Sequence, residues 1–238
     1  MNYISHHATI SIRYLVSGKL MRASALFLIF AISFNNGLAA EFIKPANTKA
    51  GYVARLLLNE VPFPGESGWV SKADTKSAML SILYVLDSRI NNVPDGYRQK
   101  ELASVNTKDI IDVITAGGVR GQCDGFYRDQ KGNFTMVSRV PKRLAYLSGI
   151  AIKGKPGKFA LLLNYGQGLA DAYFKGGIKE ADKFVGLTVI GNKKVTGRAY
   201  SWMTDRDYYH PGGDYIKIPD SQKGTLGGNR FSTLRKRK

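Results

Sequence analysis

The chain has 238 residues, 44% of them hydrophobic and 22% charged, which suits one well-packed domain and argues against wholesale disorder. Its 35 lysines and arginines outnumber its 18 aspartates and glutamates, so the formal net charge is +17. A single cysteine excludes an intrachain disulfide framework, and because only one histidine, His210, lies beyond residue 40, the rest of the chain has too few ligands for a zinc site built from Cys and His.

The first forty residues have the pattern of a secretory signal peptide. Residues 21–40 begin with the basic Arg22, continue through the apolar stretch 25–34 and end in small residues. The apolar stretch is too short to span a bilayer comfortably, so we expect cleavage after Ala40 and a secreted or periplasmic protein. An uncleaved signal anchor is the alternative, because a long polar segment precedes Met21, which is itself a second possible start.

Cleavage after Ala40 would remove three cations and no acid, and would lower the formal net charge from +17 to +14. It would leave His210 as the one histidine, so Cys-His or Ser-His catalysis would depend on that residue. A basic exported protein implies an anionic partner, and outside the cytoplasm we expect the cell wall or anionic lipid surfaces, not nucleic acid. We further expect a monomer with no cofactor, no metal and no stable membrane insertion after cleavage.

Two helices are predicted in the segment after the signal peptide. Apolar side chains at spacings of three and four predict the first over residues 50–60, with Glu60 continuing the apolar stripe. The prolines that follow stop this helix, because they cannot donate a backbone hydrogen bond. The same spacing predicts a second helix over residues 75–91, with Asp74 or Thr75 as its N-cap.

Three more helices are expected before residue 176. One begins at Asn106 or Thr107 and stops at Gly117, and the other two cover residues 141–152 and 157–175.

After Phe184 the pattern changes to short apolar runs separated by glycine, proline, asparagine and aspartate. Such runs predict small strands and long loops, and strands that follow a series of helices indicate an α+β fold. We therefore expect residues 41–238 to form a single domain, mainly helical at its start, and its basic end, "LRKRK", to be solvated and mobile.

Glu60 and Glu66 are the candidate catalytic acids. A general acid that works near neutral pH needs a carboxyl group whose pKa is raised by burial or by negative potential. Glu60 lies at a helix C-terminus, where the helix dipole is negative, and on the stripe that faces the core. Glu66 lies in a proline- and glycine-rich loop beside Trp69.

The order of these features resembles the SleB-type cell wall hydrolases, the spore-cortex-lytic family of the lysozyme-like superfamily. The resemblance covers roughly residues 50–235 and is patchy. It is carried by a helix ending in Glu60, by the pair Gly65-Glu66, and by the apolar helix "SAMLSILYVLDSRI", which ends near Arg89. It continues at "GQCDGFY" and in the segments "AYSWM" and "LGGNRF". The two glutamates are further apart than the usual close pair, and residues 128–180 hold more helix than the family pattern.

The resemblance implies a lysozyme-like fold and cleavage of the β-1,4 glycosidic bond of peptidoglycan. The family's catalytic glutamate falls on Glu60 and its second acidic position on Glu66. A competing alignment is possible, because "ESGWVSKADTKSAML" is similar to the Glu-Ser-x-aromatic start of lytic transglycosylases and would make Glu66 the acid. We prefer Glu60, since a rigid helix end holds an acid better than a proline-flanked loop.

For a glycan substrate, aromatic rings are candidates to stack on sugar faces and polar side chains to donate hydrogen bonds. The candidate substrate-binding residues are Trp69, Arg89, Gln122, Tyr127, Tyr200, Trp202 and Asn229.

Three functions remain open from the sequence. The first is a peptidoglycan hydrolase or lytic transglycosylase; in a hydrolase a second carboxylate acts as nucleophile or base, whereas in a lytic transglycosylase the sugar's own hydroxyl attacks. The second is a non-catalytic basic module that binds wall polymers or another envelope protein. The third is a cysteine-dependent amidase or peptidase, which would use Cys123 with His210.

Overall fold

A computed structural model describes residues 43–153, 157–204 and 211–237. The described residues belong to one unit, Ala39–Lys238, by the density of their contacts. The predicted signal peptide lies outside the described residues, and so does His210.

The described residues form α-helices and short antiparallel strands, in agreement with the α+β prediction. The helices are α2 (Lys49–Asn59), α3 (Lys72–Asn91), α4 (Gln99–Ala103), α5 (Ile110–Thr115), α6 (Arg139–Lys153) and α7 (Lys158–Phe174), with 3-10 turns η1 (Gly118–Arg120) and η3 (Asp220–Gln222). The strands are β1 (Phe126–Arg128), β2 (Phe134–Met136), β3 (Leu187–Ile190), β4 (Lys193–Gly197), β5 (Ser201–Thr204), β6 (Tyr215–Lys217), β7 (Thr225–Leu226) and β8 (Asn229–Leu234).

The strands pair in three antiparallel groups. β1 pairs with β2 and β3 with β4, while β8 lies between β5 and β6 and also pairs with β7. In the β5–β8 pair Trp202 lies opposite Phe231, and Thr204 lies opposite Asn229. This register fixes the position of Trp202, which becomes important at the candidate site.

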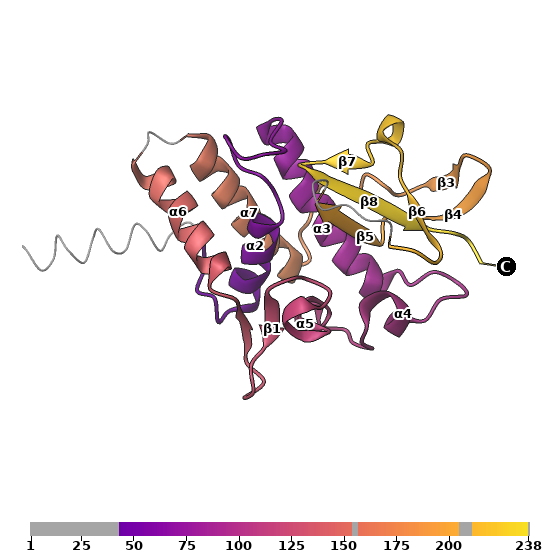
Figure 1. The fold of residues 1–238 in the computed structure, drawn as a ribbon, viewed down its shortest axis with the longest axis horizontal. Coiled ribbons are helices and arrows are strands. Elements are labelled where there is room, and N and C mark those ends of the chain that lie inside the picture. The colour runs from indigo at the N-terminus through magenta and orange to yellow at the C-terminus, as the bar shows by residue number, and fades with distance from the viewer. Residues whose placement is uncertain (1–42, 154–156, 205–210, 238) are drawn as a thin grey trace, which may run out of the picture. The chain divides into compact units, whose positions relative to one another are not determined.

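α3 lies between two groups of elements (Figure 1). On one side it contacts α2 and α7, and on the other it contacts β5 and β7. Its buried face therefore serves both the helices and the sheet. The main core contains aromatic side chains that are at most 1% exposed, among them Tyr52, Phe63, Phe126, Phe184 and Phe231.

The helix predictions for α2, α6 and α7 are correct to within two residues, but the start of α3 was predicted wrongly. Ser71 is its N-cap, and the Ser71 hydroxyl accepts a hydrogen bond from the Asp74 backbone N–H at 3.1 Å. Asp74 therefore lies in the first helical turn, and Thr75 is fully buried and donates to the Pro62 carbonyl at 3.2 Å. Ser71, Asp74 and Thr75 are all residue types that favour an N-cap, and the position of the 61–70 loop in the fold determines that Ser71 takes this role.

α5 is also capped by a different residue from the predicted one. Asp109 accepts from the Ile111 backbone N–H at 3.0 Å, whereas Asn106 and Thr107 lie before the helix. Thr107 instead accepts from the Asp109 N–H at 2.9 Å, so the threonine supports the cap from outside.

At the basic end of the chain, residues 235–237 are exposed, and they also contact distant segments. Arg235 forms a bridge with Val195, which extends the sheet region. Arg237 stacks on the Tyr97 ring at 3.8 Å and pairs with Asp214 at 2.9 Å. An aromatic and an acidic side chain from distant segments therefore hold Arg237, and the sequence of the tail alone does not identify them.

Candidate active site at the end of the first helix

α2 ends at a position that places a carboxyl group at the protein surface. Glu60 is the C-cap residue, and its backbone N–H still donates to the Leu56 carbonyl at 3.0 Å. Pro62 prevents the helix from continuing, because it lacks a backbone donor. The Glu60 carbonyl, which the helix leaves without an internal partner, accepts a hydrogen bond from Asn229 Nδ2 at 2.7 Å. The sheet thus fixes the end of the helix.

The Glu60 carboxyl group has only neutral hydrogen-bond donors. Trp202 Nε1 donates to Oε2 at 3.1 Å, and Asn59 Nδ2 donates to Oε1 at 3.3 Å. The residue is half-buried, and no cation forms an ion pair with it among the described residues. Burial raises the pKa of Glu60, and the two hydrogen bonds oppose this only in part. The environment therefore favours the protonated form that a general acid needs.

Three predicted site residues form a connected group behind Trp202. The Arg89 guanidinium lies over the Trp202 ring, 5.5 Å from its centroid. Arg89 is 5% exposed and donates through Nη1 to Gln122 Oε1 at 2.6 Å and through Nε to the Tyr200 carbonyl at 2.9 Å. The group orients the indole whose N–H contacts Glu60. Arg89 and Gln122 therefore support the site from behind and do not face its opening.

Glu66 is held in an ion pair. Arg143 on α6 donates to Oε1 from Nε at 3.1 Å and to Oε2 from Nη2 at 2.5 Å, and the Phe63 backbone N–H donates to Oε2 at 2.7 Å. This bidentate geometry is the strong form of an arginine–carboxylate contact. Both oxygens of Glu66 are thus already occupied.

Arg143 also satisfies the last carbonyls of α2. Its Nη1 donates to the Leu58 carbonyl at 2.8 Å and to the Asn59 carbonyl at 3.4 Å, and its Nη2 donates to the Val61 carbonyl at 2.9 Å. Helix-terminal carbonyls lack internal partners and carry partial negative charge, so a cation there is favourable. Sequence reasoning did not identify Arg143, because its partners lie about eighty residues earlier in the chain.

Glu60 and Glu66 line the same surface pocket of about 930 Å³. Its wall is made by the end of α2, the 61–70 loop, Arg143 and the turn between β7 and β8. Further polar side chains come from Asp74, Thr204 and Thr225. Asp74 accepts from the Gly227 N–H at 2.7 Å, which ties the start of α3 to the β7–β8 turn. The pocket is large enough for a small ligand or for part of a polymer.

None of the seven predicted substrate-binding residues is among those that line the pocket. Tyr200 is 1% exposed, and its hydroxyl donates to the Asn92 carbonyl at 2.6 Å, so no ring face is available to a sugar. Asn229 is fully buried and bonds backbone carbonyls. Trp69 lies under Lys158, and Tyr127 lies in β1, and neither lines the pocket. Tyr200 and Asn229 are therefore structural, which corrects their prediction as substrate contacts.

Cys123 is unsuited to act as a nucleophile. Its side chain is 2% exposed, and burial, followed by the negative charge of Glu60, raises the pKa of the thiol. The reactive form of cysteine is the thiolate, which this environment opposes. Cys123 therefore does not fit the role of nucleophile that a cysteine-dependent amidase or peptidase requires.

No group of three His, Cys, Asp or Glu side chains among the described residues is placed to hold a metal ion. None of the helices in the described ranges is both long and apolar enough to cross a membrane.

A comparison of the chain with known protein families, with curated proteins and with solved structures found no match.

Proposed function

We propose that this chain is an exported glycosidase that cleaves the β-1,4 glycan bond of peptidoglycan, with Glu60 as the general acid. The observation that carries the proposal is the setting of Glu60: a half-buried carboxyl group with neutral donors and a raised pKa, on the wall of a pocket of about 930 Å³. A carboxylic acid kept protonated near neutral pH can protonate the leaving oxygen as the glycosidic bond breaks.

Glu60 is a better acid than Glu66 on these contacts. Glu66 is paired with Arg143 through both oxygens, an arrangement that fixes a loop and leaves neither oxygen free for a substrate. Between these two glutamates the contrast favours Glu60, in a scheme in which Glu60 donates its proton to the leaving oxygen, the sugar's own hydroxyl attacks the anomeric carbon as the glycosidic bond breaks, and the Glu60 carboxylate takes up the hydroxyl proton. Water attack would need a second free carboxylate opposite Glu60.

The contacts between distant segments support membership of the SleB-like, lysozyme-like group. The segments that carry the resemblance lie far apart in sequence, yet Arg89 bonds Gln122, Trp202 bonds the Glu60 carboxyl and Asn229 bonds the Glu60 carbonyl. Residues from four separate segments thus converge on one helix end. A shared role at a catalytic glutamate explains why these segments occur together.

The test is digestion of purified cell wall sacculi by the chain from Glu41 onward, with mass spectrometry of the soluble products. Anhydro-sugar ends would indicate transglycosylation, and reducing ends would indicate hydrolysis. Cleaved stem peptides alone would contradict the proposal. Salt-sensitive binding to sacculi without any soluble product would favour the non-catalytic wall-binding module, which the net charge of +17 also suits.

A further inference from the structure

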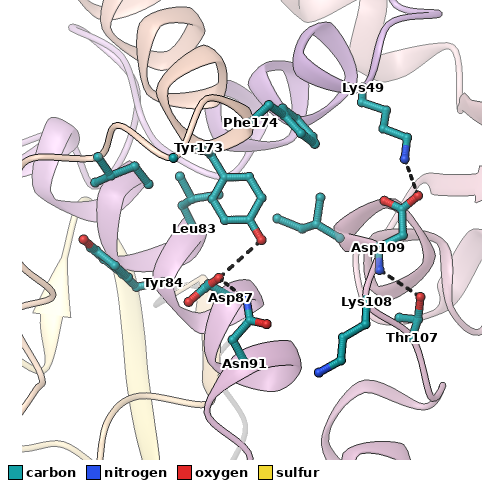
Figure 2. A pocket seen from close by; sticks show the side chains of 13 residues that line it. Lys49, Leu83, Tyr84, Asp87, Asn91, Thr107, Lys108, Asp109, Tyr173 and Phe174 are labelled. Atoms are coloured by element: carbon teal, nitrogen blue, oxygen red, sulfur yellow. Dashed lines mark hydrogen bonds and ion pairs between the residues drawn. The ribbon is translucent and has the colours of Figure 1, made fainter.

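A second pocket, of about 800 Å³, lies apart from the Glu60 site and shares no lining residue with it. One face of α3 supplies Leu83, Asp87 and Asn91, which are four residues apart and so lie on the same side of the helix. The end of α7 supplies Tyr173 and Phe174. The loop before α5 supplies the remaining wall, including Lys108 and Asp109 (Figure 2).

The Asp87 carboxylate in this pocket has no cationic partner among the described residues. Its Oδ1 accepts from Asn91 Nδ2 at 2.8 Å and from the Tyr173 hydroxyl at 3.3 Å, and its Oδ2 accepts from Asn92 Nδ2 at 3.5 Å. All three donors are neutral. In a chain with 35 lysines and arginines against 18 acids, a half-buried carboxylate without an ion pair is notable. The pocket thus offers an uncompensated negative charge.

A single uncompensated positive charge lies at the edge of the same pocket. Lys108 is exposed, and its ammonium group has no hydrogen bond or ion pair within the described ranges. The other lysine of the lining, Lys49, is paired with Asp109 at 2.5 Å, as Figure 2 shows. Lys108 and Asp87 line one pocket without pairing with each other, so each remains available to a ligand.

Aromatic and aliphatic side chains line another part of the pocket. Tyr173 and Phe174 pack edge to face with centroids 5.4 Å apart, and Phe174 is 40% exposed. Ile178 adds partly exposed aliphatic surface. Aromatic rings beside a carboxylate favour a bound ammonium group, because the ring face also attracts cations.

We propose that this pocket binds a short peptide with free ends, its ammonium group on Asp87 and its carboxylate on Lys108. An apolar side chain of the peptide would then contact Tyr173 and Phe174. The volume of about 800 Å³ falls in the range of small-ligand sites and suits two or three residues. The inference does not require Glu60 to be catalytic, since the two pockets share no residue.

The test is isothermal titration calorimetry of the full chain with the tripeptide Ala-Leu-Ala in three forms: free, N-acetylated and C-amidated. The free peptide should bind, and blocking either end should weaken binding by about tenfold or more. No binding at millimolar peptide, or equal binding of the three forms, would overturn the proposal.

Two variants assign the ends of the peptide. Asp87→Asn should abolish the preference for a free amine and keep the preference for a free carboxylate, whereas Lys108→Gln should do the opposite. Matched controls are Asp95→Asn and Lys142→Gln, which change exposed residues outside both pockets and should preserve both preferences. Lys108 is exposed, so the Lys108→Gln variant should fold. If this variant keeps the wild-type preference for a free carboxylate, that result by itself contradicts the assignment.

Discussion

Glu60 and Glu66 are six residues apart and line one pocket, yet their surroundings are opposite. Neutral donors contact Glu60, while the guanidinium of Arg143 contacts Glu66. Charged donors stabilise a carboxylate, and burial among neutral groups disfavours it. The proposed division of roles, with Glu60 as the acid and Glu66 in a structural ion pair, rests on these contacts.

The stability of the protein should depend on pH through Glu60. Burial raises the pKa of Glu60 in the folded state, so between the unfolded and folded pKa values the folded state holds a proton that the unfolded chain has lost. Stability then falls as pH rises through that interval, by at most about 1.4 kcal/mol per pH unit. The Glu60→Gln variant has no carboxyl group at this position and avoids this loss. In urea unfolding experiments, the unfolding free energy of the variant minus that of wild type should therefore increase with pH. A difference that does not change with pH would contradict the assignment.

Trp202 should tune the acid. Its Nε1–H donates to Glu60 and favours the ionised form, so Trp202→Phe should raise the pKa of Glu60 further. The alkaline limb of the pH–rate profile for wall digestion should then move to higher pH. Trp69→Phe is the matched control, because the Trp69 indole lies outside the pocket and its N–H has no partner among the described residues. An equal shift in both variants would refute a specific role for Trp202.

The residue-scale prediction from sequence was right about where Glu60 lies. Its position on the apolar stripe at a helix end correctly predicted a partly buried carboxyl group. The partner of Glu66 could not be predicted, because Arg143 is 77 positions away and no local spacing marks it. Tyr200 and Asn229 were misassigned because sequence does not distinguish a core residue from a ligand contact.

At the scale of elements, Arg143 joins α6 to the end of α2. Arg143→Ala leaves three backbone carbonyls and Glu66 without their charged donor, and we expect a loss of about 2–4 kcal/mol in unfolding free energy. Arg139→Ala on the same helix breaks an exposed pair with Asp124 and should cost less than about 1 kcal/mol. Equal losses of unfolding free energy for the two variants in denaturant titrations would contradict the role of Arg143 in joining α6 to α2.

Gly166 sets how closely α7 packs on α2 and α3. A Cβ at this position would meet Leu58 Cδ2 at 2.7 Å and Met79 Sδ at 3.3 Å, so Gly166→Ala should destabilise by about 1–3 kcal/mol. Gly168→Ala on the same helix meets nothing within 4 Å and should stabilise by up to about 1 kcal/mol through helix propensity. Thermal unfolding of both variants checks this, and changes of the same sign would contradict the packing.

The long helices were predictable, but several short elements were not. Apolar spacing located α2 and α3, whereas the proline in the first turn of α6 and the glycines after α7 located the other two long helices. The β1–β2 hairpin and α4 were missed. Segments of three to five residues have too few positions to show a period, and tertiary contacts hold them.

At the scale of the whole molecule, the α+β class was predictable from the change in pattern after Phe184, and the described strands after that residue confirm it. The contacts that assemble the Glu60 site from distant segments were not predictable. It depends on β8 placing Asn229 against the end of α2, and on β5 placing Trp202 above Glu60. These contacts join residues more than 140 positions apart, which only the fold brings together.

The net charge of +17 belongs to this scale as well. A surplus of cations attracts an anionic polymer at long range and is screened by salt, so it favours the proposed association with a cell wall but takes no part in bond cleavage. Binding and catalysis should therefore be separable, since a change at Glu60 removes at most one charge.

The most direct test of this account compares the rate at which wild type, Glu60→Gln and Glu66→Gln release soluble muropeptides from sacculi. We expect Glu60→Gln to bind sacculi like wild type and to release no product above background, and Glu66→Gln to be less stable but still active under conditions where it is folded. Full activity in Glu60→Gln, or loss of activity in a folded Glu66→Gln alone, would contradict the assignment of Glu60 as the general acid.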